Sequence, residues 1–290
     1  ERVYSDNIQL DRLSLKLDKE KIQVTILKVK LNNNKISESD FYIDDIIFNS
    51  KYSFVNTKSF DLNGFDLQIG KAKLSGDFSI EDSEFKKIHV KFDESCENVI
   101  SAMPGSWSNI FSNADINGRI KADILISESP SQSVEYNCVF KNMPEEFSSR
   151  KLRNPFKVSF ARKSEELVGP GTSNWVPFPY ISNHMVTSLI TTEDATFFKH
   201  KGINTSALVL AIIDGIKGRP RGGSTITMQL AKNIWLNESR TISRKVQEIF
   251  LAMYLEQEFS KEEILELYMN IIEFGPEVFG ISKASKHYFK

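Results

Sequence analysis

The stretch GGSTITMQLAKN at residues 222–233 sets the character of the second half of this chain of 290 residues. Two glycines are followed by Ser224 and Thr225, a pattern that predicts a helix over residues 224–236. The first backbone N–H groups of a helix have no partner within it and point outward. A helix start of this kind suits a phosphate or pyrophosphate group.

Helical periodicity continues on both sides of that stretch. We expect one helix through HMVTSLITTED, capped by Ser182 or Asn183, and another from about Thr241 to Glu258. Ser260 followed by Glu263 predicts a capping box at the start of a further helix. The expected apolar stripe of the 241–258 helix consists of Ile242, Val246, Ile249, Phe250 and Met253.

The first 160 residues follow a different pattern, in which apolar and polar residues alternate. The clearest examples are KIQVTILKVKL (21–31), residues 60–80 and ADINGRIKADILIS (114–127). This alternation predicts an antiparallel sheet with one buried face and one solvated face. Asn63-Gly64, Gly70 and Gly76 are expected to punctuate the strands, and residues 103–114 to form a loop or short helix. No catalytic group of residues is evident in this half.

A charged and then Gly- and Pro-rich segment separates these two patterns. We therefore expect an α+β chain of two domains, with an antiparallel β-rich domain at 1–160 and a mostly α domain at 175–290. Residues 161–174 are expected to be the linker between the two domains.

Composition excludes several classes of protein. The net charge of −1 argues against a generally basic nucleic-acid binder, and the four histidines form no spaced metal-ligand motif. Cys96 and Cys138 either form one disulfide or remain two buried thiols. No apolar run reaches about 18 residues, so we expect no membrane-spanning helix. Because the sequence begins at Glu1 without a signal-like segment, we expect any signal or anchor to lie outside it.

The stretch TTEDATFFKHKG at residues 191–202 offers candidate acid–base chemistry. Glu193 and Asp194 end an otherwise apolar helix, and Phe197 and Phe198 are expected to form an apolar wall beside them. Poor solvation would raise the pKa of such a carboxyl group toward the range useful in proton transfer. The alternative is an acidic pair at a helix end whose aromatic neighbours only anchor the loop.

Basic residues concentrate in the segment that follows. In a nearly neutral chain this concentration favours an anionic partner, although a solvated basic face is the alternative. Glu248 is expected either to form a surface salt bridge with Arg244 and Lys245 or to face Glu193 across a cleft. A carboxylate base opposite a cationic site suits glycosyl transfer from a sugar pyrophosphate. The seven basic residues are Lys217, Arg219, Arg221, Lys232, Arg240, Arg244 and Lys245.

From about Trp175 to Phe289 the chain resembles the peptidoglycan glycosyltransferases of family 51, most closely their monofunctional branch. The resemblance rests on five motifs in order, the last of them looser than the others. They are EDATFFKHKG (193–202), GGSTITMQLAKN (222–233), RKVQE (244–248), KEEILELYMN (261–270) and GISKASKHYF (280–289).

This resemblance implies a lysozyme-like glycosyltransferase fold that polymerises lipid II into β-1,4-linked strands with inversion. Glu193 matches the general base that deprotonates the acceptor 4-hydroxyl, and Glu248 the second acid, which assists at the pyrophosphate directly or through Mg or Mn. The remaining substrate-binding residues fall into three groups. Those around the pyrophosphates are Lys232, Arg240, Arg244 and Lys245; those lining the cleft are Ser224, Thr225 and Gln229; those shaping the first motif are Asp194, Phe197 and His200. Tyr268 and Asn270 are expected to hold the cleft together by packing and hydrogen bonding.

The sequence departs from the family pattern in several places. Met228 stands where a glutamine is common and is expected to remove a polar group from the cleft lining. Met269 replaces a usual leucine, and Lys283 and Lys286 replace small or uncharged residues. Family members continue with further helices beyond the position of Lys290, so we expect the transferase domain to be truncated at its C-terminus.

The resemblance also implies partners and a location. The expected partners are lipid II, the growing glycan strand, the membrane surface and cell-wall synthesis proteins, with no nucleic acid. The expected location is the bacterial envelope, at the periplasmic or outer face of the cytoplasmic membrane. The first half faintly resembles AsmA-like β-rich proteins in its repeated N-G pattern. Two alternatives are a lysozyme-like glycan-cleaving enzyme and a non-catalytic envelope binding or assembly module with a degenerate transferase half.

Overall fold

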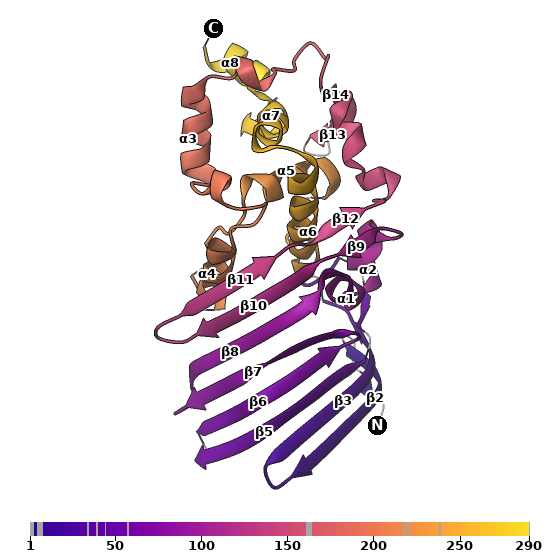
Figure 1. The fold of residues 1–290 in the computed structure, drawn as a ribbon, viewed down its shortest axis with the longest axis vertical. Coiled ribbons are helices and arrows are strands. Elements are labelled where there is room, and N and C mark those ends of the chain that lie inside the picture. The colour runs from indigo at the N-terminus through magenta and orange to yellow at the C-terminus, as the bar shows by residue number, and fades with distance from the viewer. Residues whose placement is uncertain are drawn as a thin grey trace. The chain divides into compact units, whose positions relative to one another are not determined.

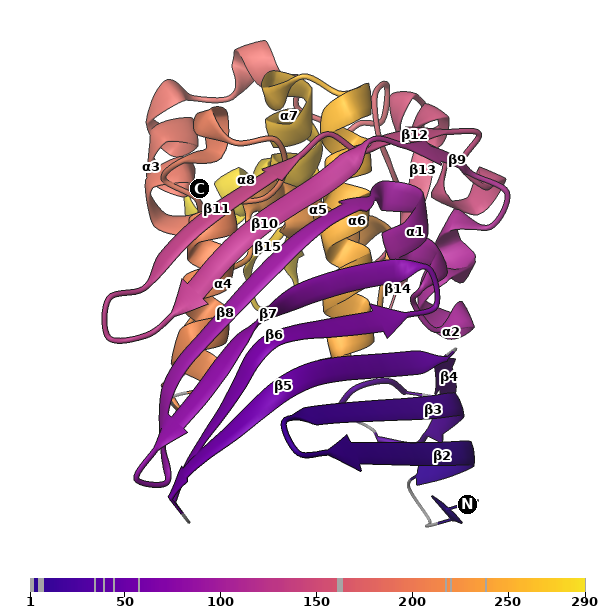
Figure 2. The same ribbon diagram turned by 60° about the horizontal axis from the view of Figure 1, so that its bottom comes forward.

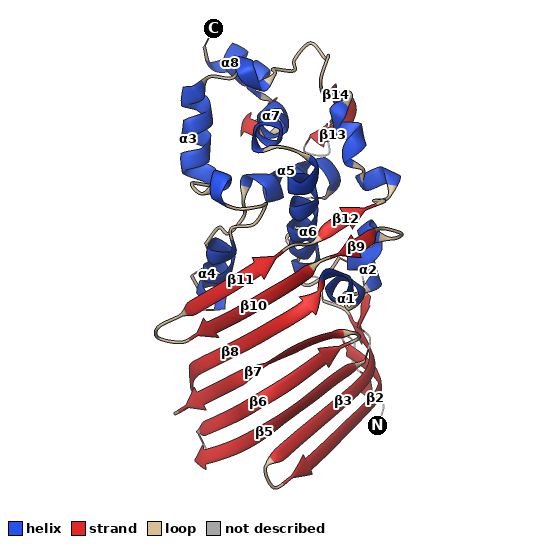
Figure 3. Cartoon of the chain, in the orientation of Figure 1, coloured by secondary structure: helices blue, strands red, loops and turns tan. Residues whose placement is uncertain are grey.

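The computed structural model describes residues 3–4, 8–33, 35–38, 40–43, 45–56, 58–160, 164–216, 218–219, 221–237 and 239–289. Strands dominate the first half of the chain and helices the second, as Figure 3 shows by colour. The chain divides into two compact units. The first consists of Glu1–Asn142 with Thr241–Ser243, and the second of Met143–Arg240 with Arg244–Lys290.

The first unit is built on one antiparallel sheet, in which ten strands pair among the described residues (Figure 1). Their order is β1-β2-β3-β5-β6-β7-β8-β10-β11, with β4 paired to β3. Sequential strands lie side by side in this order (Figure 2). The strands are β1 (Val3–Tyr4), β2 (Ile8–Asp18), β3 (Lys21–Leu31), β4 (Phe41–Ile43), β5 (Ile46–Asn56), β6 (Ser59–Ile69), β7 (Ala72–Glu81), β8 (Glu84–Ser95), β10 (Arg119–Ile126) and β11 (Ser131–Tyr136).

The predicted strands are confirmed, but two of the predicted turns are wrong. Gly70 does end β6, whereas Asn63-Gly64 lies inside β6, where the register with β7 shifts between Leu62 and Phe65. A β-bulge accommodates a glycine without ending the strand. Gly76 lies within β7, where an added Cβ would come within 1.9 Å of the His89 carbonyl oxygen.

Short elements and a disulfide complete the first unit. Cys96 and Cys138 are bridged, so the interpretation as two free thiols is wrong. The bridge joins the first residue of α1 to the residue just before β12, and Phe111 and Phe140 pack nearby as buried side chains. The elements are α1 (Cys96–Ser101), α2 (Gly105–Ser108), η1 (Asn109–Phe111), β9 (Asp115–Asn117) and β12 (Val139–Lys141), and they confirm the short helix expected within 103–114.

The second unit is mostly helical, as the sequence predicts. A hairpin of β13 and β14 occupies part of the segment expected to be linker, and a second hairpin, β15–β16, follows α7. Helices α4 and α8 were not predicted. The main elements are β13 (Phe156–Phe160), β14 (Ser164–Val168), α3 (Asn183–Glu193), η5 (Phe197–Lys199), α4 (Thr205–Ile216), α5 (Ile226–Trp235), α6 (Ile242–Glu258), α7 (Lys261–Ile271), β15 (Glu273–Gly275), β16 (Val278–Phe279) and α8 (Ile281–Tyr288).

The helix starts follow from capping side chains. Ser260 and Glu263 form the predicted capping box of α7. Thr225 caps α5 by accepting the backbone N–H of Met228, so the helix begins two residues later than predicted. Ser182 is the N-cap of α3 but makes no side-chain capping hydrogen bond.

The core of the second unit lies where α5, α6 and α7 pack together. Leu230 from α5, Leu251 from α6 and Leu265 from α7 are fully buried there. Ile242 is 54% exposed, so its predicted place in the apolar stripe is wrong, whereas Phe250 and Met253 are buried as expected. No helix in the described part of the chain is long and apolar enough to cross a bilayer.

Candidate active site

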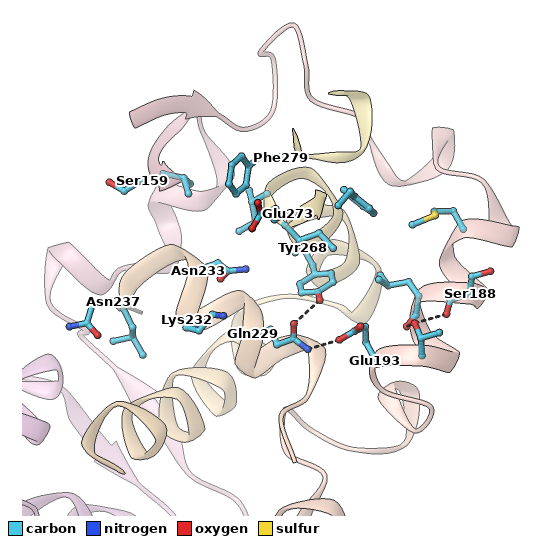
Figure 4. Close-up of a pocket in the computed structure, with 18 residues that line it drawn as sticks. Ser159, Ser188, Glu193, Gln229, Lys232, Asn233, Asn237, Tyr268, Glu273 and Phe279 are labelled. Carbon is cyan, nitrogen blue, oxygen red and sulfur yellow. Dashed lines mark hydrogen bonds between the residues drawn. The ribbon is translucent and has the colours of Figure 1, made fainter. Parts of the chain in front are cut away.

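A pocket of about 520 Å³ opens in the second unit where α3, α5 and the end of α7 meet (Figure 4). Glu193, the last residue of α3, contributes a carboxylate to the lining of this pocket. Gln229 and Lys232 lie one turn apart on α5, and Tyr268 reaches the pocket from α7. The structure thus brings three of the predicted site residues, Glu193, Gln229 and Lys232, into one pocket.

A hydrogen-bonded series connects the three helices at this pocket (Figure 4). Gln229 Nε2 donates to Glu193 Oε2 at 2.9 Å. Tyr268 Oη donates to Gln229 Oε1 at 2.9 Å. Burial, and then the negative charges of Glu193 and Asp194, raise the pKa of the Tyr268 hydroxyl well above its usual range. The expectation that Tyr268 holds the cleft together by hydrogen bonding is confirmed, and the residue also lines the pocket.

The predicted aromatic wall beside Glu193 is wrong. Phe197 is fully buried and contacts Phe198 and His200, while Lys261 Nζ lies 4.1 Å from its ring centroid. Phe198 is 59% exposed, and neither ring lines the pocket. Glu193 is itself exposed, so the expectation of a poorly solvated carboxylate is also wrong. The apolar part of the pocket comes instead from Met185, Leu189, Ile271, Ile272, Phe274 and Phe279.

Asp194 is buried behind the pocket and joins the first motif to α5. Both of its carboxylate oxygens lie 3.0 Å from His200 Nε2, and Oδ2 also accepts the backbone N–H of Ile226 at 3.2 Å. A carboxylate at the first turn of a helix is favoured by the helix dipole. Asp194 and His200 therefore join the first motif to α5 and do not line the pocket; their predicted part in substrate binding stays a prediction.

The loop before α5 is fastened by its two hydroxyl residues. Thr225 Oγ1 donates to the Gly202 carbonyl at 2.6 Å. Gly202 has a φ of +89°, and an added Cβ would come within 2.8 Å of the Ala252 carbonyl oxygen on α6. Ser224 Oγ accepts a hydrogen bond of 2.6 Å from Lys245 Nζ. Neither Ser224 nor Thr225 lines the pocket that holds Glu193, and their place in a substrate cleft stays a prediction.

Glu248 lies in a buried ion-pair cluster and not on the surface. Its side chain is 3% exposed; one oxygen pairs with Arg244 and the other accepts from Lys245 Nζ at 2.9 Å. Glu248 does not line the pocket that holds Glu193. Arg240 is exposed and precedes α6, whereas Arg244 lies within that helix. Lys217, the first residue of the basic segment, lies outside the described residues.

The residues that depart from the family pattern are either buried in the core or in contact with a polar side chain of another segment. Met228 is fully buried in the core, so the expectation that it lines the cleft is wrong. Met269 is also fully buried, as an apolar exchange allows. Lys283 on α8 pairs with Glu166 on β14 at 2.7 Å, and Lys286 Nζ lies 3.4 Å from Asn174 Oδ1.

In comparisons with known proteins, the family model described as Transglycosylase matches residues 162–290 of this chain. This segment of the chain belongs to the transglycosylase family. A "Biosynthetic peptidoglycan transglycosylase" of Nitrosomonas eutropha is 46% identical over 117 residues, covering 40% of this chain and 48% of the relative. "Penicillin-binding protein 2a" of Streptococcus pneumoniae (strain D39) is 46% identical over 115 residues, covering 40% of this chain and 16% of the relative.

A third relative, "Penicillin-binding protein 1A/1B" of Bacillus subtilis, is 34% identical over 181 residues, which is 60% of this chain and 18% of that protein. The chain therefore spans about half the length of the Nitrosomonas relative and a smaller share of the penicillin-binding proteins.

The transglycosylase segment contains pocket residues that sequence reasoning did not assign to the site. Asn233 directly follows Lys232 on α5, Asn237 lies just beyond the end of that helix, and Glu273 follows α7. The Lys-Asn pair at 232–233 belongs to a quoted motif and could have indicated Asn233. Ser159 on β13 could not have been found, because tertiary folding alone brings the hairpin to the pocket.

Asn270 of the transglycosylase segment braces the approach to the site. Its side chain bonds both the backbone N–H and the carbonyl of Val176, each at 2.8 Å, which confirms its expected holding role. The described residues contain no group of three or more His, Cys, Asp or Glu side chains that could hold a metal ion. A divalent cation at the pyrophosphate stays a prediction from the family resemblance.

Proposed function

We propose that this chain is a peptidoglycan glycosyltransferase that polymerises lipid II into β-1,4-linked glycan strands with inversion. One observation carries the proposal: an exposed carboxylate, Glu193, is held by Gln229 in a pocket that also contains Lys232, within a transglycosylase-family segment. The finer fold we propose for this segment is the lysozyme-like one.

Glu193 is the general base in this proposal. Its carboxylate removes the proton of the acceptor 4-hydroxyl as that oxygen attacks the anomeric carbon of the donor sugar, whose bond to the pyrophosphate breaks. Attack opposite to the leaving group gives inversion. A positioned base of this kind contributes about 10²- to 10⁴-fold to a rate.

Cations stabilise the pyrophosphate that leaves. Lys232 lies in the same pocket as Glu193, and Arg244 and Lys245 add a second cationic group on α6. Charge that develops on a departing phosphate is stabilised by lysine and arginine side chains fixed in advance. The Arg240 side chain is exposed, so it is free to join them when substrate binds.

Glu248 has a different role from Glu193. It is buried with one oxygen on Arg244 and the other on Lys245, so its charge already has two partners. We propose that it holds these two cations in place for the pyrophosphate. Its contribution is then to the position of the cations rather than to proton removal.

The partners of the proposed enzyme follow from its substrate. They are lipid II, the growing strand and the membrane surface that carries both, and the proposed location is the cell envelope, at the outer face of the cytoplasmic membrane. Cell-wall synthesis proteins are proposed as further partners. A relative named as a biosynthetic peptidoglycan transglycosylase supports this setting.

The test is incubation of the chain with fluorescent lipid II in detergent, followed by separation of products by chain length. We expect polymer that lysozyme digests to disaccharide units, together with release of polyprenyl pyrophosphate. Glu193→Gln should form polymer at least about 100-fold more slowly. Binding of lipid II without polymer would indicate the non-catalytic binding module, and shortening of a preformed glycan would indicate the cleaving enzyme.

A further inference from the structure

Three side chains from three different helices form one series at the edge of the pocket. Tyr268 of α7 donates to Gln229 of α5, and Gln229 donates to Glu193 of α3, each at 2.9 Å (Figure 4). Glu193 Oε1 has no hydrogen-bond partner among the residues that the structure describes. One carboxylate oxygen is thus held while the other remains open to an incoming hydroxyl group.

While Glu193 is ionised, the donors and acceptors of this hydrogen-bonded series can be arranged in only one order. A glutamine amide presents a donor at one end and an acceptor at the other, and its two flipped orientations have nearly the same shape. An ionised carboxylate only accepts hydrogen bonds, so Gln229 must turn its NH₂ group toward Glu193. Its carbonyl oxygen then faces Tyr268, whose hydroxyl group must donate.

Tyr268 is suited to be a permanent donor. Its side chain is almost fully buried, and burial together with the charges of Glu193 and Asp194 keeps its hydroxyl group protonated. The charged groups that line the same pocket are Lys232 on α5 and Glu273 after α7. Neither is hydrogen-bonded to the Gln229 amide in the structure, so Tyr268 is its partner on the side away from Glu193.

We propose that Tyr268 is a positioning residue for Glu193: by fixing the orientation of the Gln229 amide, it holds one carboxylate oxygen in place and leaves the other facing the acceptor. This inference rests on the proposed role of Glu193 as the base. A hydrogen bond to the charged form of an acid favours that form, so loss of the series should make Glu193 harder to ionise.

The test compares Tyr268→Phe, Gln229→Met and a matched control, Tyr254→Phe. Tyr254 is also a buried tyrosine, and its hydroxyl group donates a hydrogen bond to Ser149 Oγ, but it does not line the pocket. The pH dependence of polymer formation is measured for each variant. Ionisation of Glu193 is followed separately by ¹³C NMR of labelled glutamate carboxylates, with Glu193→Gln identifying the signal.

We expect the midpoint of the acidic limb, and the NMR midpoint of Glu193, to move to higher pH by about half a unit in Tyr268→Phe. The shift in Gln229→Met should be at least as large, because that change removes both hydrogen bonds. Tyr254→Phe should lower thermal stability but leave both midpoints at the wild-type value.

The outcomes separate this inference from the proposed function. Unchanged midpoints in Tyr268→Phe and Gln229→Met, with polymer still formed, would overturn the inference and leave the function standing. A shifted NMR midpoint in a chain that forms no polymer would uphold the control of Glu193 by Tyr268 and contradict the function. Equal shifts in Tyr254→Phe and Tyr268→Phe would overturn the inference, because the effect would then be general to buried tyrosines.

Discussion

Lys245 Nζ lies 2.9 Å from Glu248 Oε2, in an ion pair whose carboxylate side chain is only 3% exposed. The same ammonium group donates to Ser224 Oγ at 2.6 Å, so it connects α6 to the loop that precedes α5. Both carboxylate oxygens of Glu248 are paired with cations, whereas only one carboxylate oxygen of Glu193 accepts a hydrogen bond from a described residue. The two acids that sequence patterns present as a pair therefore have different environments.

Replacement of Glu248 by alanine should destabilise the second unit. The change leaves Arg244 and Lys245 without their shared buried partner, and breaking a buried ion pair from one side costs about 3–5 kcal/mol. Both cations are partly exposed, which reduces the cost toward the lower part of that range. Denaturant unfolding followed by tryptophan fluorescence measures it. Glu273→Ala, at an exposed carboxylate, should stay within about 0.5 kcal/mol of the wild type. Equal stability of the two variants would contradict the assignment of Glu248 to a buried cluster.

Restoring the family glutamine at position 228 should harm the protein rather than improve it. Met228 is fully buried in the core, so Met228→Gln places a polar amide out of reach of solvent. An unsatisfied buried polar group costs about 1–3 kcal/mol. Thermal unfolding checks the loss, with Met228→Leu as the control because it conserves volume and polarity. A more stable Met228→Gln variant would show that the side chain reaches the polar pocket after all.

The capping box of α7 should make part of the stability depend on acid pH. Burial raises the pKa of Glu263, but the Ser260 backbone N–H and Arg153 outweigh it, so the folded-state pKa lies below its ordinary value. A lowered folded-state pKa gives stability that is present above the unfolded value, about 4.3, and lost as the pH falls further. Wild-type protein should therefore lose more stability than Glu263→Gln between pH 5 and pH 3, by thermal unfolding at each pH. Glu262→Gln, at an exposed neighbour in the same helical turn, is the control; if it behaves as Glu263→Gln does, the capping assignment is wrong.

Local patterns predicted the elements well and the site only in part. The strand β3 matches residues 21–31 because apolar–polar alternation, here with one slip after Ile26, is a local signal that needs no knowledge of the rest of the fold. The capping box at Ser260 and Glu263 was equally local. The bulge at Asn63-Gly64 was missed because its residues are also turn residues, and only cross-strand pairing distinguishes the two.

The environment of the site residues depended on tertiary packing. Spacing placed Phe197 and Phe198 near Glu193 along the chain, but the turn at η5 buries the first ring and exposes the second. Spacing also left Glu248 with two interpretations; the structure shows the ion pairs with Arg244 and Lys245 of the first, but buried and not on the surface. The faint AsmA-like pattern of the first half stays a prediction.

The most direct test of the account compares two carboxylates of one pocket. Glu193 and Glu273 both line it and both are exposed, but only Glu193 is held by Gln229. We predict that Glu193→Gln slows polymer formation from lipid II by at least about 100-fold, the effect expected of a general base. Glu273→Gln should remain within about 3-fold of the wild type, because the same change is made away from the reacting hydroxyl group. A Glu193→Gln variant that polymerises as fast as Glu273→Gln would contradict the central claim that Glu193 is the base.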